Sequence, residues 1–231
     1  MHDGYRTQQH PIAIDGVETL VIRSLLDRDQ FHDPLGHAAM LGISSAAWPM
    51  FGVPWPSGLQ LAARLARRPV RAGERILEIG CGLALPSLVG HRRGADMTAS
   101  DCHPLAGAFL LENLRLNGLA PMRYCHGDWS HVPQQLPGQD LAPTVQGRFD
   151  LIMGSDVLYE RDDGGALPLF IERHAMPVSE VLIVDPERGN RAAFTRRLQQ
   201  LGYVLEETLL RDEAVEQAPE YRGRLLRYRR Y

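Results

Sequence analysis

Acidic side chains recur in this sequence where short apolar runs end. Glu78 lies in the run 75–79, Asp101 follows the run 95–100, Asp128 follows a third run and Asp156 follows a fourth. Carboxylates in a cleft can bind hydroxyl groups, hold a cation or guide an amine that must lose its proton. If the runs are neighbouring strands of a parallel sheet, these acids lie along the edge where such sheets bind ligands.

The glycine-rich stretch after the first run predicts a strand–turn–helix crossing. Gly80 and Gly82 have no Cβ, so the backbone can turn tightly there and a ligand can approach it. Pro86 suits the first turn of a helix, where its missing N–H costs nothing. Such turns also occur for packing alone. Features elsewhere in the chain have to decide between a ligand-binding turn and a turn that serves packing only.

The turn could bind either of two kinds of cofactor, a dinucleotide or S-adenosylmethionine. A dinucleotide fingerprint starting at Gly80 needs a small residue where the chain has Leu85. A carboxylate of Glu78 at the mouth of the site would repel a pyrophosphate, whereas it favours the sulfonium and amino groups of S-adenosylmethionine. Asp101 comes 23 residues after Glu78, close to the spacing of about 20 at which an acid meets a ribose hydroxyl pair.

The chain resembles the class I, seven-strand methyltransferases that use S-adenosylmethionine. Within that class it resembles the protein-lysine methyltransferases related to the electron-transfer flavoprotein beta-subunit lysine methyltransferase. The resemblance covers roughly residues 48–210 and is carried by Trp55-Pro56-Ser57-Gly58, Leu77-Glu78-Ile79-Gly80-Cys81-Gly82, Asp101 with Pro104, Asn113-Leu114-Arg115-Leu116-Asn117, Asp128-Trp129, Asp156-Val157-Leu158-Tyr159 and Val184-Asp185-Pro186.

The resemblance implies that Asp156 orients the amine that accepts the methyl group and that Tyr159 shapes its pocket. The alternatives are a helix N-cap for Asp156 and simple packing for Tyr159. Asp185, which ends the fifth strand of the predicted sheet, is a further candidate for the acceptor side.

The resemblance also implies a cofactor-binding set. Glu78 and Gly80 are expected at the methionine part and Asp101 at the ribose. Asp128 is expected to accept from the adenine amine and Trp129 to stack, unless Trp129 is an ordinary core aromatic. The complete set is Trp55, Glu78, Gly80, Gly82, Asp101, Asp128, Trp129 and Ser155.

The sequence departs from common methyltransferase patterns at two points, and the second narrows the class of acceptor. Ala84 stands where the glycine loop often has a third glycine. The segment after the fourth strand lacks the Asn/Asp-Pro-Pro-Tyr sequence of enzymes that methylate adenine or glutamine, which argues against those acceptors.

The expected fold is α/β. It is a Rossmann-like, doubly wound, seven-stranded sheet, mostly parallel with an antiparallel C-terminal strand. Residues 1–58 form an N-terminal extension and cleft-covering segment, and residues 59–231 form the methyltransferase core of one structural domain. In the extension, 12–14 and 17–23 pair through Asp15-Gly16, a favoured hairpin turn, beside the main sheet. Strands are expected near 75–79, 95–100, 122–126, 149–154, 179–184, 203–208 and 223–228, and helices near 59–66, 86–93, 104–117, 165–175 and 190–201.

Composition narrows the partners. The 231 residues carry a net charge of −3, which gives no support for nucleic-acid binding, and no apolar run approaches a membrane span. The N-terminus lacks an apolar signal core, which favours a cytoplasmic protein. Cys81, Cys102 and Cys125 are expected as buried thiols, and no metal site is expected. Arginines that alternate along 222–230 are expected on a solvated sheet edge.

All 25 basic residues are arginine, and lysine is absent. This excludes a P-loop lysine, a Schiff-base lysine and methylation of the chain's own lysines. The sequence therefore predicts an S-adenosylmethionine-dependent methyltransferase acting on a protein lysine. The alternatives are a small-molecule N- or O-methyltransferase, a nicotinamide-dependent oxidoreductase and a non-catalytic cofactor-binding module.

Overall fold

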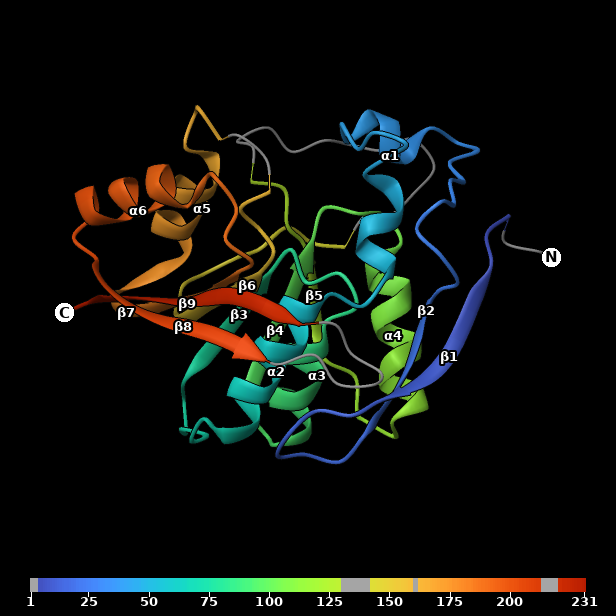
Figure 1. Ribbon diagram of the computed structural model, residues 1–231, viewed down its shortest axis with the longest axis horizontal. Coiled ribbons are helices and arrows are strands. Elements are labelled where there is room, and N and C mark those ends of the chain that lie inside the picture. The colour runs from blue at the N-terminus through green and yellow to red at the C-terminus, as the bar shows by residue number, and fades with distance from the viewer. Residues whose placement is uncertain (1–3, 130–141, 160–161, 213–219) are drawn as a thin grey trace.

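The computed structural model describes residues 4–129, 142–159, 162–212 and 220–231. A seven-stranded sheet with the order β5-β4-β3-β6-β7-β9-β8 forms its centre (Figure 1). Every strand runs parallel to the others except β9, which is antiparallel to β7 and to β8. The expected α/β fold with one antiparallel C-terminal strand is confirmed. The strands are β3 (Arg75–Ile79), β4 (Asp96–Asp101), β5 (Arg123–His126), β6 (Phe149–Ser155), β7 (Ala175–Asp185), β8 (Val204–Asp212) and β9 (Tyr221–Arg230).

Two apolar cores lie on the two faces of this sheet because its side chains alternate. Ile76 of β3 faces a core shared with the N-terminal segment, whereas Leu77 and Ile79 face a core shared with α5 and α6. The buried run of β3 is typical of a central parallel strand that is covered on both faces. The helices on the first face are α2 (Pro56–Arg67), α3 (Leu85–Arg92) and α4 (Ala106–Leu116), and those on the second are α5 (Ala166–His174) and α6 (Arg191–Gln200).

Helix boundaries follow local chemistry. Pro56 and Pro86 lie in the first turns of α2 and α3, as expected of a residue without an N–H. α2 ends at Arg67 because Arg68 precedes Pro69 and takes an extended conformation. The division at residue 58 falls inside α2 and stays a prediction.

The N-terminal strands form a separate two-stranded sheet, and its details differ from the expectation. β1 (Thr7–Ile12) pairs with β2 (Leu20–Leu25), with Ile12 opposite Leu20, so the connection is longer than an Asp15-Gly16 turn. The buried side chains of Leu20 and Ile22 fix this register. The hairpin lies on α4 and not beside the main sheet (Figure 1).

The arginines of the last strand are not on a sheet edge. β9 lies between β7 and β8, so the expectation of a solvated edge is wrong. Their guanidinium groups meet carboxylates on neighbouring strands and turns. Arg224 pairs with Glu207 and Glu187, and Arg227 pairs with Glu180. Charge pairing across strands therefore accounts for the alternation.

Short segments complete the described structure. They are α1 (His37–Met40) and the 3-10 helix η1 (Trp48–Gly52). Trp48 is fully buried and makes edge-to-face contacts with Tyr5, Phe31 and Phe51, so it plugs the core between the extension and α4. The sequence 133–148, which holds three prolines and two glycines, is expected to form a loop, and residues 133–141 of it lie outside the described residues.

Candidate active site

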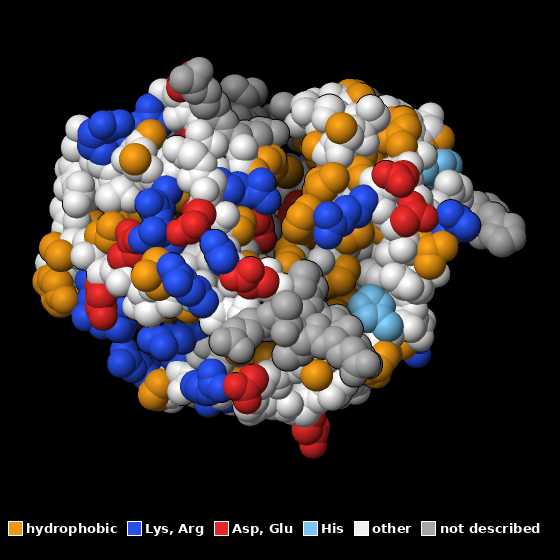
Figure 2. Space-filling model, in the orientation of Figure 1, with side chains coloured by type: hydrophobic (Ala, Val, Ile, Leu, Met, Phe, Trp, Pro, Cys, Tyr) orange, Lys and Arg blue, Asp and Glu red, His pale blue; other side chains and the backbone are white. Residues whose placement is uncertain are grey.

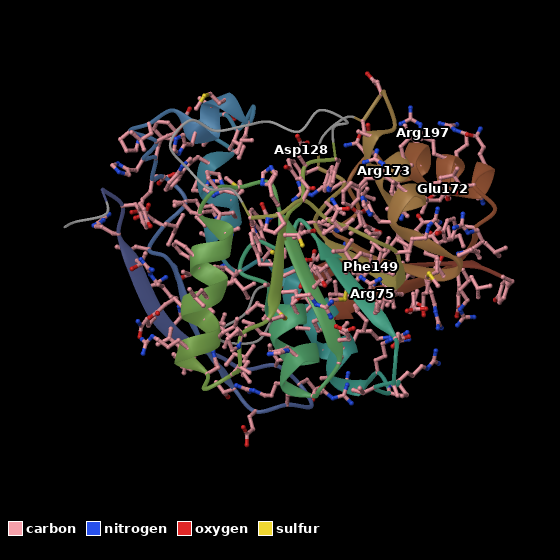
Figure 3. The ribbon with its side chains drawn as sticks, turned by 180° about the vertical axis from the view of Figure 1, so that it is seen from behind. Arg75, Asp128, Phe149, Glu172, Arg173 and Arg197 are labelled. Carbon is pink, nitrogen blue, oxygen red and sulfur yellow. The ribbon has the colours of Figure 1, made fainter. Side chains whose placement is uncertain are left out.

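A cleft of about 980 Å³ lies at the carboxyl ends of β3, β4, β5 and β6. Figure 2 shows a hollow between the side that carries α5 and α6 and the side that carries α1. Figure 3 shows Asp128 at this end of the sheet, whereas Arg75 and Phe149, which begin β3 and β6, lie further down. The opening is therefore where an open α/β sheet binds ligands.

The glycine loop forms one wall of the cleft. Gly80 and Gly82 have positive φ angles of 56° and 51°, which favour glycine. A Cβ on Gly80 would lie 2.9 Å from Val157, and one on Gly82 would lie 2.9 Å from the Phe51 carbonyl oxygen. Ala84 takes the left-handed conformation with φ 58° and ends the turn before α3. Both glycines are therefore required for the loop to pack against Val157 and Phe51, whether or not a ligand is bound.

Glu78 lies beneath this loop and not at the mouth of the site, so that expectation is wrong. Its side chain is 1% exposed and is not among the cleft-lining residues. Glu78 Oε2 accepts hydrogen bonds from the backbone N–H of Ser87, at 2.9 Å, and from the Ser87 hydroxyl. Burial raises the pKa of Glu78 to about 8. It therefore fastens the first turn of α3, and any contact with cofactor stays a prediction.

Asp101 lines the cleft and accepts hydrogen bonds from the loops that follow β3 and β4. Its Oδ2 accepts from the Gly82 N–H and its Oδ1 from the His103 N–H, both at 2.8 Å. The residue lines the cleft although it is 7% exposed, and burial raises the pKa of its carboxyl group. A carboxylate offers about four lone-pair sites, so Asp101 keeps acceptor capacity for a ligand hydroxyl.

His103 lines the same wall, stacked on Phe51 with ring centroids 3.7 Å apart. Burial lowers the pKa of His103 to about 3, so the ring is neutral at physiological pH. His103 is therefore a wall residue of the cleft.

Asp128 and Trp129 line the cleft beyond β5. Trp129 also packs against the core on the α5–α6 face, so the two interpretations of this residue are compatible. Within the described part of the chain, its buried Nε1–H has no hydrogen-bond partner. A buried indole N–H normally finds an acceptor, so this atom is a candidate donor for a bound ligand.

Trp55 and Ser155 complete the cofactor set, and both line the cleft. The Trp55 ring is held in place because its Nε1 donates to the Met50 carbonyl oxygen at 2.8 Å and the Arg28 guanidinium stacks over it. Ser155 is the last residue of β6 and faces Gly58 of α2.

Asp156 follows β6 in a left-handed conformation with φ 58°, and its N–H donates to the Val184 carbonyl oxygen at 3.0 Å. Residues 157 and 158 form a turn, and no helix begins among the described residues 157–159, so Asp156 caps no helix there. Its Oδ1 accepts from the Arg188 guanidinium at 3.1 Å, and its Oδ2 is buried with no hydrogen-bond partner among the described residues. Asp156 lines the cleft, although its unsatisfied Oδ2 is itself buried.

Tyr159 lines the cleft and is 53% exposed. An exposed aromatic ring at the cleft is suited to pack against an incoming side chain. Packing within the protein core does not account for its place.

Arg188 is the site residue that the sequence interpretation missed. It lines the cleft from the turn between β7 and α6, and Asp185 Oδ2 accepts from its backbone N–H at 3.0 Å. Asp185 itself is fully buried and is not among the cleft-lining residues. Only the Asp-x-x-Arg spacing of 185–188 hinted at this turn, because its ion-pair partner Asp156 is 32 residues away in the sequence.

The sequence analysis also made predictions about the cysteines, metal binding and membrane spans. All three cysteines lie in the described ranges and none is in a disulfide; Cys81 is buried and the other two are half-buried. Among the described residues, no group of histidine, cysteine and acidic side chains is placed to hold a metal ion. In the same part of the chain, no helix has the length and apolarity to cross a membrane.

Comparison with solved structures identifies the fold. The magnesium protoporphyrin IX methyltransferase from Synechocystis, solved with bound S-adenosylmethionine, superposes with a TM-score of 0.55 at 14% identity. The match covers 76% of this chain and 78% of that one. The fold is that of the class I methyltransferases. A cleft at the carboxyl ends of the strands is therefore found here on a methyltransferase fold.

Sequence comparison gives relatives on the same fold. The electron transfer flavoprotein beta subunit lysine methyltransferase of Mus musculus is 30% identical over 164 residues, 70% of this chain and 59% of that protein. The histone-arginine methyltransferase METTL23 of Rattus norvegicus is 31% identical over 115 residues, 47% of each. The chain thus spans less than two thirds of the length of these relatives. No model of a protein family matches the chain.

Proposed function

We propose that this chain is an S-adenosylmethionine-dependent methyltransferase whose acceptor is a lysine side chain of a protein. The single observation that supports this best is the carboxylate of Asp156, a cleft-lining residue whose Oδ2 is buried and has no hydrogen-bond partner among the described residues. The names of the relatives, which describe lysine and arginine methyltransferases of proteins, support the same class of acceptor.

The cleft suits this cofactor better than a dinucleotide. Carboxylates of Asp101, Asp128 and Asp156 line it, and these would repel a pyrophosphate. Asp101 is suited to hold the ribose hydroxyls, with Asp128 and Trp129 at the adenine and Gly80 and Gly82 at the methionine part. The cofactor supplies a methyl group that is already activated by a positively charged sulfur.

The lysine amine that accepts the methyl group must be deprotonated and oriented by the protein. A lysine amine has a reference pKa of about 10.4 and must lose a proton before it can attack. In our proposal Asp156 orients the amine and helps it to lose that proton, while Tyr159 packs against its carbon chain. Alignment in a site without bulk water supplies most of the remaining rate enhancement.

An arginine acceptor is the second candidate because Asp156 already binds a guanidinium group, that of Arg188. A small-molecule acceptor remains the alternative within the same chemistry. The cytoplasmic location expected from the sequence also stays a prediction.

The test is transfer of radiolabel from S-adenosylmethionine to proteins of a desalted lysate of the source organism, followed by mass spectrometry of the labelled residue. Asp156→Asn should abolish a discrete labelled band while cofactor binding persists. Ser57→Ala is the matched control, because Ser57 is buried and bonds to Tyr221 without lining the cleft. Cofactor binding by the wild type with no labelled protein band would contradict the protein acceptor.

A further inference from the structure

Arg188 holds the carboxylate that the proposed function assigns to the acceptor. Arg188 Nη2 lies 3.1 Å from Asp156 Oδ1, and the two side chains are 36% and 13% exposed. The ion pair therefore lies in the cleft wall and not on the open surface. A cationic acceptor that approached Asp156 would meet another cation already in place.

The arginine is held there by its backbone. Asp185 Oδ2 accepts from the Arg188 N–H, and Glu187 takes a left-handed conformation and pairs with Arg224. The next turn is fixed as well, because Asn190 Nδ2 donates to the Leu158 carbonyl oxygen at 3.0 Å. The backbone of Arg188 is thus fixed, and its guanidinium group is held by Asp156 alone among the ion pairs of the described residues.

The ion pair between Asp156 and Arg188 leaves polar atoms of both side chains without a partner among the described residues. Asp156 Oδ2 and Arg188 Nε are both buried and have no hydrogen-bond partner within the described part of the chain. Two carboxylates, Asp156 and Asp185, contact this one arginine, one through its side chain and one through its backbone. A buried carboxylate oxygen without a donor is costly, so the site retains capacity for a further cationic N–H donor.

We propose that Arg188 is an internal competing cation in the acceptor subsite, and that an acceptor side chain must displace it from Asp156 before methyl transfer. This inference rests on the proposed function. It assigns a specificity role to Arg188: small amines compete poorly with the tethered arginine, whereas a protein acceptor gains further contacts along the cleft. Because a partly exposed ion pair is weak, displacement costs an acceptor only about fivefold in apparent affinity.

The absence of lysine from this chain gives a direct test. Arg188→Lys places an amine on the side chain that reaches Asp156, so the variant should methylate itself. The amine first releases a proton to water with the help of the Asp156 carboxylate. Its lone pair then forms a bond to the methyl carbon, the carbon–sulfur bond breaks with its electrons on sulfur, and S-adenosylhomocysteine leaves.

The measurement is intact mass and peptide mapping after incubation with S-adenosylmethionine. Arg188→Lys should gain methylene mass at position 188, and the gain should disappear when Asp156→Asn is added. Arg196→Lys is the matched control: Arg196 also lines the cleft but makes no ion pair with Asp156 among the described residues, and the variant should stay unmodified. Calorimetric binding of cofactor to each variant shows that the site is folded.

A second readout covers the case in which the shorter lysine chain cannot reach. Arg188→Ala leaves Asp156 open to n-butylamine, the lysine side chain without its backbone. This variant should methylate n-butylamine about fivefold faster than the wild type at subsaturating amine.

The outcomes separate the two proposals. Normal cofactor binding, with no modification of Arg188→Lys and equal n-butylamine rates in Arg188→Ala and wild type, would overturn the inference. The proposed function would survive that result if lysate proteins are still labelled. Failure of the wild type to bind S-adenosylmethionine would overturn the proposed function, and the inference with it.

Discussion

At the scale of single residues, the position of Glu78 changes what its charge can do. A carboxylate at the mouth of the cleft would act on a ligand through its charge. In the structure the group is buried against the first turn of α3, with a pKa of about 8, so it is largely protonated at neutral pH. Its contribution is therefore to the shape of the glycine loop, through Ser87.

This burial predicts a pH dependence of stability. The pKa of Glu78 is 4.5 in the unfolded chain and about 8 in the folded protein. The folded state then binds more protons between these values, so the free energy of unfolding falls as pH rises from about 4.5 to about 8. The loss is on the order of several kcal/mol at most, since one pKa unit is about 1.4 kcal/mol.

Chemical denaturation of wild type and Glu78→Gln between pH 6 and pH 9 measures this effect. The amide is uncharged and can still accept from Ser87, so the variant should lose less stability than the wild type as pH rises toward the folded pKa of about 8. Parallel pH profiles for the two proteins would show that Glu78 does not titrate in this range.

At the scale of elements, the N-terminal hairpin is attached to α4 by two asparagines. Asn117 Oδ1 accepts from the Val21 N–H at 2.9 Å, and Asn113 Oδ1 accepts from the Arg23 N–H at 2.7 Å. Residues four apart on a helix are about 6 Å apart and residues two apart on a strand about 6.6 Å. The spacing of the two asparagine amides therefore matches the two-residue repeat of β2. The amides bond to backbone groups of β2 that would otherwise pair with a neighbouring strand.

We expect Asn113→Ala to lower the free energy of unfolding by about 1–3 kcal/mol, because the partly buried Arg23 N–H loses its acceptor. Hydrogen exchange at Arg23 should accelerate. Leu111→Ala is the control on the same helix, since Leu111 is 64% exposed and should change stability by less than about 0.5 kcal/mol. Equal effects of the two substitutions would contradict this role for Asn113.

Local chemistry made the central elements predictable, and long-range pairing did not. The glycines at 80 and 82, the proline at 86 and the buried run 75–79 are local signals, and they indicated the β3–turn–α3 unit correctly. The hairpin register was wrong because Asp15-Gly16 favours a tight turn, whereas the burial of Leu20 and Ile22 decides the pairing. The Asp156–Arg188 pair could not be predicted, since nothing local links residues 32 positions apart.

At the scale of the whole molecule, the extension and the sheet share one core. Trp48 belongs to the apolar cluster that contains Leu20 of β2, Phe109 of α4 and Ile76 of β3. The predicted division at residue 58 would then separate two parts of one cooperative unit, with little independent stability in the first part.

Unfolding of a variant with Trp48 as its sole tryptophan, made by Trp55→Phe and Trp129→Phe, tests this cooperativity. Fluorescence of Trp48 and far-ultraviolet circular dichroism should give coincident transitions, as expected for two-state unfolding. A fluorescence transition at lower denaturant would show that the extension unfolds by itself.

The central claim is that the cleft at the carboxyl ends of β3, β4, β5 and β6 binds S-adenosylmethionine and not a dinucleotide. Titration calorimetry of the wild-type protein with S-adenosylmethionine and, separately, with NAD measures this most directly. We expect saturable one-to-one binding of S-adenosylmethionine, weakened at least tenfold by Asp101→Ala, and no detectable binding of NAD. Tighter binding of NAD, or binding of S-adenosylmethionine that Asp101→Ala leaves unchanged, would contradict the account.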